Sequence, residues 1–493
     1  EESTLFLNNG DGTFKDITSS SGIGKINCMA AAALDYNDDG YLDIVWSSGV
    51  LSNNKNNTFT PLPLTAIGIP PSYGIDVGQI ISFDYNNDGF PDLLFISYSN
   101  GVKLMHNNGD SAFADVTEAA GLTGLAPYMA GVAAGDYDND GYFDIFLSGE
   151  RGDALYKNNG NGTFTDITKE AINIETGVGG MWWGTAFFDY DNDGYLDLYL
   201  TTGGLGTNML YRNNRDGTFT DVTDSMFPEG IAPNWAAAAI GDINNDGALD
   251  IYAPGSSFTG STGGLLMNQV GLQNNWIKVK LEGVRCNKEA IGARVYVRTG
   301  GLTQIREVNT SPVETQPVHF GLGQASVIDE IEVIWPDGNV QKINDITPSQ
   351  ILTITEIVNK PPVFDPVRFK YGSTTIDEGT VVWFFITASD PDGDPLTYSA
   401  SNLPDGAKFQ PPWSPYWTIR TPNFYWCPLY DQAGVYPVVF TATDGKTEAS
   451  EIVTITVNDV NTAPFLKVYA GKTITVKTGE LLRLGLIAFD RQL

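Results

Sequence analysis

The chain has 493 residues and a formal net charge of −31, from 59 acidic and 28 basic side chains. This balance argues against a nucleic-acid-binding protein, because surfaces that recognise nucleic acids are basic. The length predicts about three domains, and no stretch of the sequence approaches the roughly 20 apolar residues that a membrane-spanning helix needs. The three cysteines lie far apart and the two histidines follow no haem or zinc motif, so neither a disulfide framework nor a catalytic zinc site is predicted.

The first half of the chain repeats one acidic motif, Asp-x-(Asp/Asn)-x-Asp-Gly-x-x-Asp, five times. The first aspartates of successive copies are 49, 52, 53 and 53 residues apart. A single copy would be equally consistent with a metal-free hairpin turn. Five copies at one period instead predict a repeat architecture in which every unit binds the same ion. The copies begin at Asp35, Asp84, Asp136, Asp189 and Asp242, and we number the loops one to five in this order.

Calcium suits these loops best, because it takes about six to eight oxygen ligands in a tolerant geometry. The side chains at positions one, three, five and nine and the carbonyl of position seven can surround one centre, and the glycine at position six permits the sharp turn. Magnesium demands a near-octahedral shell, and zinc would require Cys or His, which no loop contains. The predicted ligands are Asp35, Asn37, Asp39, Tyr41 and Asp43; Asp84, Asn86, Asp88, Phe90 and Asp92; Asp136, Asp138, Asp140, Tyr142 and Asp144; Asp189, Asp191, Asp193, Tyr195 and Asp197; and Asp242, Asn244, Asp246, Ala248 and Asp250.

The residues around the loops predict short β-strands, whereas the calcium loops of EF-hands are flanked by helices. In the fourth repeat we predict strands over 184–190, 195–201, 208–212 and 218–222, separated by Asn, Asp and Gly clusters that are typical of hairpin turns. Four strands in about 40–50 residues, repeated, indicate a propeller blade. A turn of the form Asn-Asn-Gly-(Asp/Asn)-Gly-Thr-Phe recurs at 8–14 and 158–164, with looser versions at 107–113 and 213–219.

The acidic loops and the Phe-x-Asp-(Ile/Val)-Thr strands resemble the FG-GAP or VCBS repeats of integrin α-chain propellers and of many bacterial surface proteins. The resemblance covers residues 1–270 and implies an all-β fold that begins with a calcium-binding β-propeller, which we assign to residues 1–272. Integrin propellers have seven blades, whereas this sequence shows five loop-bearing repeats and the trailing half of another. The number of blades is therefore left open.

Residues 273–357 form a second predicted domain, whose alternating strands indicate a small β-sandwich or barrel. Motifs such as Ala290-Ile291-Gly292-Ala293-Arg294 and His319-Phe320-Gly321-Leu322-Gly323 resemble the ASPIC/UnbV domain that follows such propellers in the cartilage acidic protein family. This resemblance implies an architecture more than an activity. We expect removal of calcium to destabilise the propeller more than this domain.

A third domain is predicted at 363–459, and the start of a truncated second module of the same kind at 464–493. Segments such as 389–396 resemble bacterial cadherin-like or Ig-like repeats, which implies Ig-like β-sandwiches. Asp390, Asp392 and Asp459 either hold one further calcium ion or form solvated turns, since Asp and Gly clusters are common in turns. Because the sequence begins and ends inside modules, we expect it to be a piece of a larger secreted protein.

The propeller face opposite the metal loops is the candidate ligand face. Aromatic residues that enter the blades there suit stacking on a sugar or contact with a protein; the alternative is that they pack between the blades. These residues are Tyr73, Tyr128, Trp182, Trp183 and Trp235. The tripeptide Arg151-Gly152-Asp153, of the kind that integrins recognise, lies on the same rim, but so short a match arises easily by chance.

These features favour a secreted or cell-surface, calcium-stabilised adhesion or scaffold protein without catalytic activity, whose partner is an extracellular protein or glycan. With two histidines in separate domains, no Ser-His-Asp arrangement can be proposed. Two alternatives stay open. One is a lectin-like propeller that binds glycans through the rim aromatics, and the other is a polysaccharide-degrading enzyme that uses carboxylates.

Overall fold

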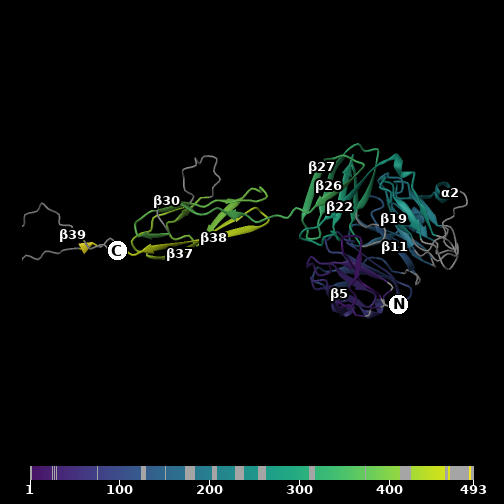
Figure 1. The fold of residues 1–493 in the computed structure, drawn as a ribbon, viewed down its shortest axis with the longest axis horizontal. Coiled ribbons are helices and arrows are strands. Elements are labelled where there is room, and N and C mark those ends of the chain that lie inside the picture. The colour runs from purple at the N-terminus through teal and green to yellow at the C-terminus, as the bar shows by residue number, and fades with distance from the viewer. Residues whose placement is uncertain are drawn as a thin grey trace, which may run out of the picture. The chain divides into compact units, whose positions relative to one another are not determined.

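In the computed structural model of the chain (Figure 1), the described residues are 3–24, 26, 28, 30–74, 76–123, 129–149, 152–172, 184–201, 208–227, 238–253, 263–309, 317–371, 374–410, 424–460, 465–466 and 488–489. Contacts within the chain divide it into two compact units, Glu1–Ile357 and Val358–Leu493. The predicted propeller and the predicted second domain therefore share the first unit. The boundary between them at residue 272 stays a prediction.

Each acidic repeat forms one antiparallel sheet whose strands lie side by side in chain order, as in a propeller blade. Within the described residues, the first four repeats have four strands each, the fifth has three, and β1 pairs only with β2. The strands are β1 (Phe6–Asn8) and β2 (Phe14–Asp16); β3 (Ala31–Leu34), β4 (Asp43–Trp46), β5 (Gly49–Asn53) and β6 (Phe59–Pro63); β7 (Val77–Phe83), β8 (Asp92–Ser97), β9 (Gly101–Asn107) and β10 (Phe113–Asp115); β11 (Met129–Gly135), β12 (Asp144–Gly149), β13 (Ala154–Asn158) and β14 (Phe164–Asp166); β15 (Gly184–Phe188), β16 (Asp197–Thr201), β17 (Met209–Asn213) and β18 (Phe219–Asp221); and β19 (Ala239–Gly241), β20 (Asp250–Ala253) and β21 (Gly264–Leu266).

Successive blades pack face to face. The first strands of neighbouring blades lie against one another, β3 against β7, β7 against β11 and β11 against β15. Along β12, Ile145 and Leu147 belong to the hydrophobic layer shared with the second blade, while Phe146 belongs to the layer shared with the fourth. Neighbouring residues of a strand point to opposite faces, so a strand buried on both faces has to be apolar at nearly every position. The apolar run Ile-Phe-Leu that follows the third loop is explained by this packing.

The strands predicted for the fourth repeat are confirmed, with a shift at the acidic loop. The first strand ends at Phe188 and the second begins at Asp197, two residues later than predicted. The reason is that Asp189 already turns its carboxylate into the loop, where it accepts backbone N–H groups. The loop therefore occupies the whole interval between its first and ninth aspartates.

The second domain is a β-sandwich, which decides between the two forms predicted. Its sheets have the orders β25-β22-β28 and β24-β23-β26-β27, and β22 pairs with β28 in parallel. Trp335 and Phe320 are among the fully buried residues of the core between the sheets. The strands are β22 (Asn275–Glu282), β23 (Arg294–Thr299), β24 (Leu302–Glu307), β25 (Val318–Gly323), β26 (Ile328–Ile334), β27 (Val340–Ile346) and β28 (Gln350–Thr355).

The second unit contains an Ig-like sandwich with the sheet orders β30-β32-β36-β35 and β31-β38-β37-β34. Its core is aromatic: Phe384 stacks on Phe424 at 4.5 Å between ring centroids, and Phe440 meets both rings edge-on. Of the predicted module at 464–493, the structure describes only β39 and β40, which pair with each other. The strands are β29 (Val363–Phe364), β30 (Arg368–Tyr371), β31 (Thr375–Asp377), β32 (Val382–Phe385), β33 (Ala388–Ser389), β34 (Thr397–Ser401), β35 (Lys408–Phe409), β36 (Phe424–Trp426), β37 (Gly434–Thr443), β38 (Glu448–Asn458), β39 (Phe465–Leu466) and β40 (Ala488–Phe489).

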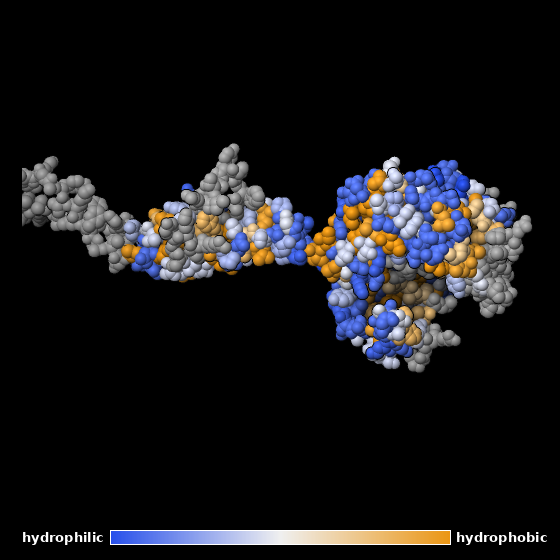
Figure 2. Space-filling model, turned by 45° about the horizontal axis from the view of Figure 1, so that its top comes forward, coloured by the Kyte–Doolittle hydropathy of each residue, from blue (hydrophilic) through white to orange (hydrophobic). Residues whose placement is uncertain are grey.

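Helices are short wherever the structure describes the chain. They are α1 (Thr168–Ala171), α2 (Thr223–Met226), η1 (Leu64–Ile67), η2 (Pro71–Gly74) and η3 (Gly271–Gln273). Among the described residues, no helix has the length and apolar character needed to cross a membrane. The visible surface of the first unit is a mosaic of hydrophilic and hydrophobic residues (Figure 2).

Candidate metal centre

Each acidic loop joins the first strand of a blade to the second, and its first aspartate fixes the shape of the loop. In the third loop, Asp136 Oδ1 accepts the N–H of Asp140 and Asp136 Oδ2 accepts the N–H of Gly141, both at 3.0 Å. The same two bonds form in the other four loops. Gly141 has a φ of +92°, a conformation that residues with a side chain rarely adopt, so this turn requires the glycine at position six.

The ninth aspartate of each loop is the first residue of the second strand, and its carboxylate lies near that of the first aspartate. In the third loop, carboxylate oxygens of Asp136, Asp138 and Asp144 lie within 4.8 Å of one another, and the equivalent residues of the fourth loop do the same. The first and ninth aspartates of both loops are buried. The structure thus brings together three of the four predicted side-chain ligands in each of these loops; their role as ligands stays a prediction.

Burial perturbs the protonation of these carboxylates strongly. Burial, together with the negative charge of neighbouring aspartates, raises the pKa of Asp43, Asp92 and Asp136 to about 7. Burial also places the pKa of Asp144 and Asp197 well above its ordinary value. A buried carboxylate beside other carboxylates is unfavourable in its charged form, and a bound cation reverses this because it stabilises the negative charge.

Some carboxylate oxygens in the loops are buried and have no hydrogen-bond partner, namely Asp43 Oδ2, Asp138 Oδ1 and Asp191 Oδ1. Leaving a buried polar atom unsatisfied costs about 1–3 kcal/mol, and an oxygen-binding cation would remove this cost. All the predicted donors are carboxylate, amide or backbone oxygens, the set that calcium prefers. The residues of the loops therefore fit a calcium ion.

Basic side chains of the second domain contact aspartates of the loops. Lys278 Nζ on β22 lies 2.5 Å from Asp242 Oδ2 of the fifth loop, and both side chains are buried. Arg294 Nη1 on β23 lies 3.1 Å from Asp84 Oδ2 of the second loop. Glu307 Oε2 accepts the N–H of Asp84 at 3.0 Å, so an acidic side chain also meets this loop. These contacts link positions about 30–220 residues apart in the chain, and no local sequence signal could have revealed them.

Two glycines permit this close approach. A Cβ on Gly321 of β25 would overlap Asp189 Oδ2 and would lie 2.5 Å from the Cα of Asn192 in the fourth loop. A Cβ on Gly247 of the fifth loop would overlap the indole of Trp276. The backbone contact is tight as well, since Gly323 donates its N–H to the Asn192 carbonyl at 2.8 Å. The second domain is therefore packed directly on the loops.

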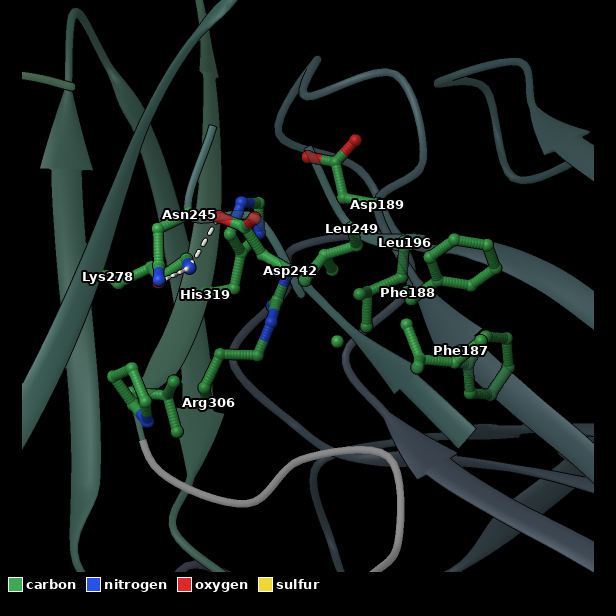
Figure 3. A pocket seen from close by; sticks show the side chains of 14 residues that line it. Phe187, Phe188, Asp189, Leu196, Asp242, Asn245, Leu249, Lys278, Arg306 and His319 are labelled. Atoms are coloured by element: carbon green, nitrogen blue, oxygen red, sulfur yellow. Dashed lines mark hydrogen bonds and ion pairs between the residues drawn. The ribbon is translucent and has the colours of Figure 1, made fainter. Parts of the chain in front are cut away.

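A cavity of about 220 Å³ lies where the fourth and fifth loops meet the second domain (Figure 3). Phe187 and Leu196 contribute to its apolar wall, and Lys278, Arg306 and His319 lie opposite them. His319 Nε2 donates to the Gly247 carbonyl at 3.0 Å. Burial lowers the pKa of His319 to about 4, so its imidazole is neutral at neutral pH and serves as a hydrogen-bonding group of this interface.

Models of three known families match the chain in the order of its domains. The FG-GAP-like repeat matches residues 1–46, 84–147, 138–200 and 189–253, the ASPIC and UnbV domain matches 283–361, and the putative Ig domain matches 361–458. The chain carries FG-GAP-like repeats, an ASPIC/UnbV domain and an Ig-like domain. The predicted resemblances are confirmed, and the matched domains are non-catalytic in kind.

Curated relatives of the chain include cartilage acidic protein 1 of Homo sapiens, which is 29% identical over 322 residues, covering 61% of this chain and 46% of the relative. The Xenopus tropicalis protein of the same name is 27% identical over 286 residues, covering 54% of this chain and 42% of the relative. The chain thus spans somewhat less than half the length of these relatives.

Among solved structures, an Agrocybe aegerita lectin that recognises non-reducing terminal N-acetylglucosamine has a TM-score of 0.38 and 21% identity, covering 54% of this chain and 75% of the lectin. The Vibrio cholerae biofilm matrix protein Bap1 has a TM-score of 0.25 and 11% identity, covering 93% of this chain and 72% of that protein. Both scores are low, so the fold of the FG-GAP-like repeats rests on their own sheet order and packing.

The turns between the third and fourth strands hold the loops in place, a role that was not predicted from the sequence. In the third FG-GAP-like repeat, Asn158 donates its backbone N–H to Asp144 Oδ1 at 2.8 Å. Its side-chain amide donates to the Phe143 carbonyl of the same loop and to the Tyr85 carbonyl of the preceding loop. The recurrence of the Asn-Asn-Gly turn was the available signal. Equivalent backbone bonds to the ninth aspartate come from Asn53, Asn107, Asn213 and Asn268.

The candidate ligand face is described only in part. Tyr128, Trp182, Trp183 and Trp235 lie outside the described residues. Tyr73 is half-buried, packs against the core between the first two blades and donates its hydroxyl to Asp115 Oδ2 at 2.7 Å. Asp153 of the integrin-type tripeptide is buried, and burial raises its pKa to about 7. That carboxylate is therefore not displayed to a partner in this structure.

The three aspartates considered in the Ig-like domain do not meet. Asp392 lies beside Lys360, whose N–H it accepts at 2.5 Å, near the turn that joins β37 to β38. Asp459 follows the far end of β38, a strand of 11 residues. At about 3.3 Å per residue, the two ends are on the order of 30 Å apart. One ion cannot bind Asp390, Asp392 and Asp459 together, so the structure contradicts the alternative of a joint calcium site and leaves that of solvated turns.

Proposed function

We propose that this chain belongs to a secreted or cell-surface protein whose FG-GAP-like propeller is stabilised by about five calcium ions and which serves in adhesion or as a scaffold. The observation that carries the proposal is the set of acidic loops. In the third loop, Lys157 pairs with Asp138 and Asp140, but Asp136 and Asp144 beside them are buried and have raised pKa values. A calcium ion in each loop would supply further positive charge and would contact the buried oxygens that have no hydrogen-bond partner.

The position of the loops supports a structural role for the ions rather than a catalytic one. The ASPIC/UnbV domain packs on the second, fourth and fifth loops through Arg294, Gly321 and Lys278. A metal that activates water or polarises a substrate needs an open coordination position. Ions in loops that a second domain covers instead stabilise the packed arrangement, which suits a rigid module that presents its remaining surface to a partner.

Binding measurements with the whole chain test this proposal. We expect it to bind extracellular proteins or glycans in a calcium-containing buffer and to lose this binding after calcium is removed. A panel of purified matrix proteins and a glycan array, each probed with and without calcium, provides the measurement. Binding confined to glycans would favour the lectin alternative. Release of products from acidic polysaccharides would contradict the non-catalytic role and favour the enzyme alternative.

A further inference from the structure

The fourth residue of each acidic loop is not a predicted ligand, yet it has the same unusual conformation in all five loops. It is Asp38 in the first loop and Asn87, Asn139, Asn192 and Asn245 in the others. Their φ angles are +54°, +62°, +58°, +57° and +58°. Asn and Asp tolerate this left-handed region better than other residues with a side chain. The conformation therefore explains why the position holds Asn or Asp, but not why four of the five residues are Asn.

The amides of three of these asparagines connect consecutive loops. Asn87 Nδ2 donates to the Gly141 carbonyl at 2.9 Å, Asn139 Nδ2 to the Gly194 carbonyl at 3.0 Å, and Asn192 Nδ2 to the Gly247 carbonyl at 2.9 Å. Each acceptor is the glycine at position six of the next loop. The second, third, fourth and fifth loops are thereby joined in one row, which we call the asparagine ladder.

Each of these three hydrogen bonds is one rung of the ladder, and each ends on a peptide group that holds a predicted metal ligand. The peptide group between Gly194 and Tyr195 accepts a hydrogen bond from Asn139 through the Gly194 carbonyl. The N–H of the same peptide group belongs to Tyr195 and donates to Asp193 Oδ1 at 2.9 Å. The third and fifth loops repeat this arrangement at Asp140 and Asp246. Hydrogen bonds in such a chain polarise and strengthen one another. The amide of one loop thus acts on the carboxylate at position five of the next.

The ASPIC/UnbV domain holds both ends of the ladder. At one end, Arg294 Nη1 donates to Asn87 Oδ1 at 2.8 Å while it also pairs with Asp84. At the other end, Lys278 Nζ lies 3.5 Å from Asn245 Oδ1 while it pairs with Asp242. The close-up in Figure 3 shows this second group. The basic residues of that domain therefore fix both the terminal asparagines and the first aspartates of the terminal loops.

The first loop stands outside this ladder. An ionised Asp38 has no proton to donate, so it cannot form the corresponding bond to the Gly89 carbonyl, although both residues line the same small cavity. We infer that Asn87, Asn139 and Asn192 are positioning residues that couple neighbouring metal loops, so that the second to fifth loops fill with calcium as one set and the first loop fills independently. This inference rests on the proposed calcium function.

The test is calorimetric titration of the metal-free whole chain with calcium, with the fold checked by circular dichroism. We expect the unaltered chain to bind five ions, one for each loop, in a cooperative phase for four loops and a separate phase for the first. Asn139→Gly removes a rung while keeping a residue that accepts a positive φ. This variant should still bind five ions, but the cooperative phase should divide into separate phases. The free calcium concentration at the midpoint of binding should rise about five-fold, as expected for one lost hydrogen bond.

Asn57→Gly is the matched control, because Asn57 has a φ of +63°, is exposed and lies in a turn outside the ladder. It should leave both phases unchanged, and equal isotherms for the Asn57 and Asn139 variants would overturn the coupling. Asp38→Asn supplies the missing donor and should bring the first loop into the cooperative phase. If the Asn139 variant fails to fold, this variant decides, and a first loop that still fills separately contradicts the inference.

The same titration distinguishes failure of the coupling from failure of the proposed function. Five ions that bind independently to the unaltered chain would remove the coupling alone. A metal-free chain that binds no calcium at all would remove the calcium function together with the inference that rests on it.

Discussion

At the scale of single residues, the predicted calcium sites depend on carboxylates that the fold removes from water. Asp43 is fully buried, its Oδ1 accepts the N–H of Asn53 at 2.6 Å, and its Oδ2 has no hydrogen-bond partner. A carboxylate in this state is stable only when it is protonated or paired with a cation. The choice between proton and metal therefore governs how the loops respond to substitution and to pH.

Substitution of a single predicted ligand should remove one ion. Asp193 Oδ1 accepts the N–H of Tyr195, and its Oδ2 lies 2.7 Å from Arg215, so Asp193→Ala removes a carboxylate from the centre of the fourth loop. Asp216→Ala is the control, because Asp216 lies in the adjacent exposed turn, where its carboxylate accepts hydrogen bonds from Thr218. Calorimetry should count one ion fewer in the first variant and no loss in the second. Equal counts would show that the ligand positions are assigned wrongly.

The metal-free chain should become more stable as the pH falls. Burial raises the pKa of Asp136 to about 7 and that of Asp189 to about 8, both above their ordinary value of 3.8. Between pH 8 and pH 4 the folded state therefore binds more protons than the unfolded state, so the free energy of unfolding rises as the pH is lowered. Thermal melts of the metal-free chain at pH 8 and pH 5 test the sign. A lower melting temperature at pH 5 would contradict it.

At the scale of the structural element, the sequence predicted more of the strands and loops than of the contacts between them. Strands such as β16 and the turns beside them follow from the local pattern of apolar, Asn and Gly residues. The bond from Asn158 to the Tyr85 carbonyl spans 73 residues and exists only because two blades lie side by side. Local patterns carry no information about such a distance, and the asparagine ladder was missed for the same reason.

The turn asparagines should contribute more to the free energy of unfolding than their exposed neighbours. Asn158→Ala removes two side-chain bonds to backbone carbonyls at a fully buried site, which should cost about 2–4 kcal/mol in the free energy of unfolding. Asn159→Ala changes the next residue, which is exposed and bonds to Thr163 and Thr165, and should cost well under half as much. Denaturant unfolding in calcium measures both variants. Similar losses would mean that the bond to the preceding blade contributes little.

At the scale of the whole first unit, the propeller and the ASPIC/UnbV domain are packed together rather than joined by a flexible link. The sequence suggested two separate domains, because each has its own strand pattern and its own family resemblance. Lys278, Arg294 and Gly321 gave no signal of their role, since a basic residue or a glycine on a strand has many local explanations. Calcium removal should consequently affect both domains, and not mainly the propeller as expected from the sequence.

A glycine substitution tests this packing directly. Gly321→Ala would place a Cβ in overlap with Asp189 Oδ2 and against the backbone of Asn192, so the domain or the loop has to move. We expect a loss of at least about 3 kcal/mol in the free energy of unfolding and a weaker fourth calcium site. Gly241→Ala is the control, because a Cβ there meets nothing within 4 Å. Equal stability of the two variants would show that the contact is not maintained in solution.

The most direct test is differential scanning calorimetry of the whole chain with calcium and after its complete removal, with metal content verified by mass spectrometry. A ligand that binds only the native state adds about 2.7 kcal/mol per site at a hundredfold excess over its Kd. The transition of residues 1–357 should therefore move to a much lower temperature as one unit, while that of the Ig-like domain stays in place. An unchanged transition for residues 1–357 in verified metal-free protein would contradict the account of the acidic loops as structural calcium sites.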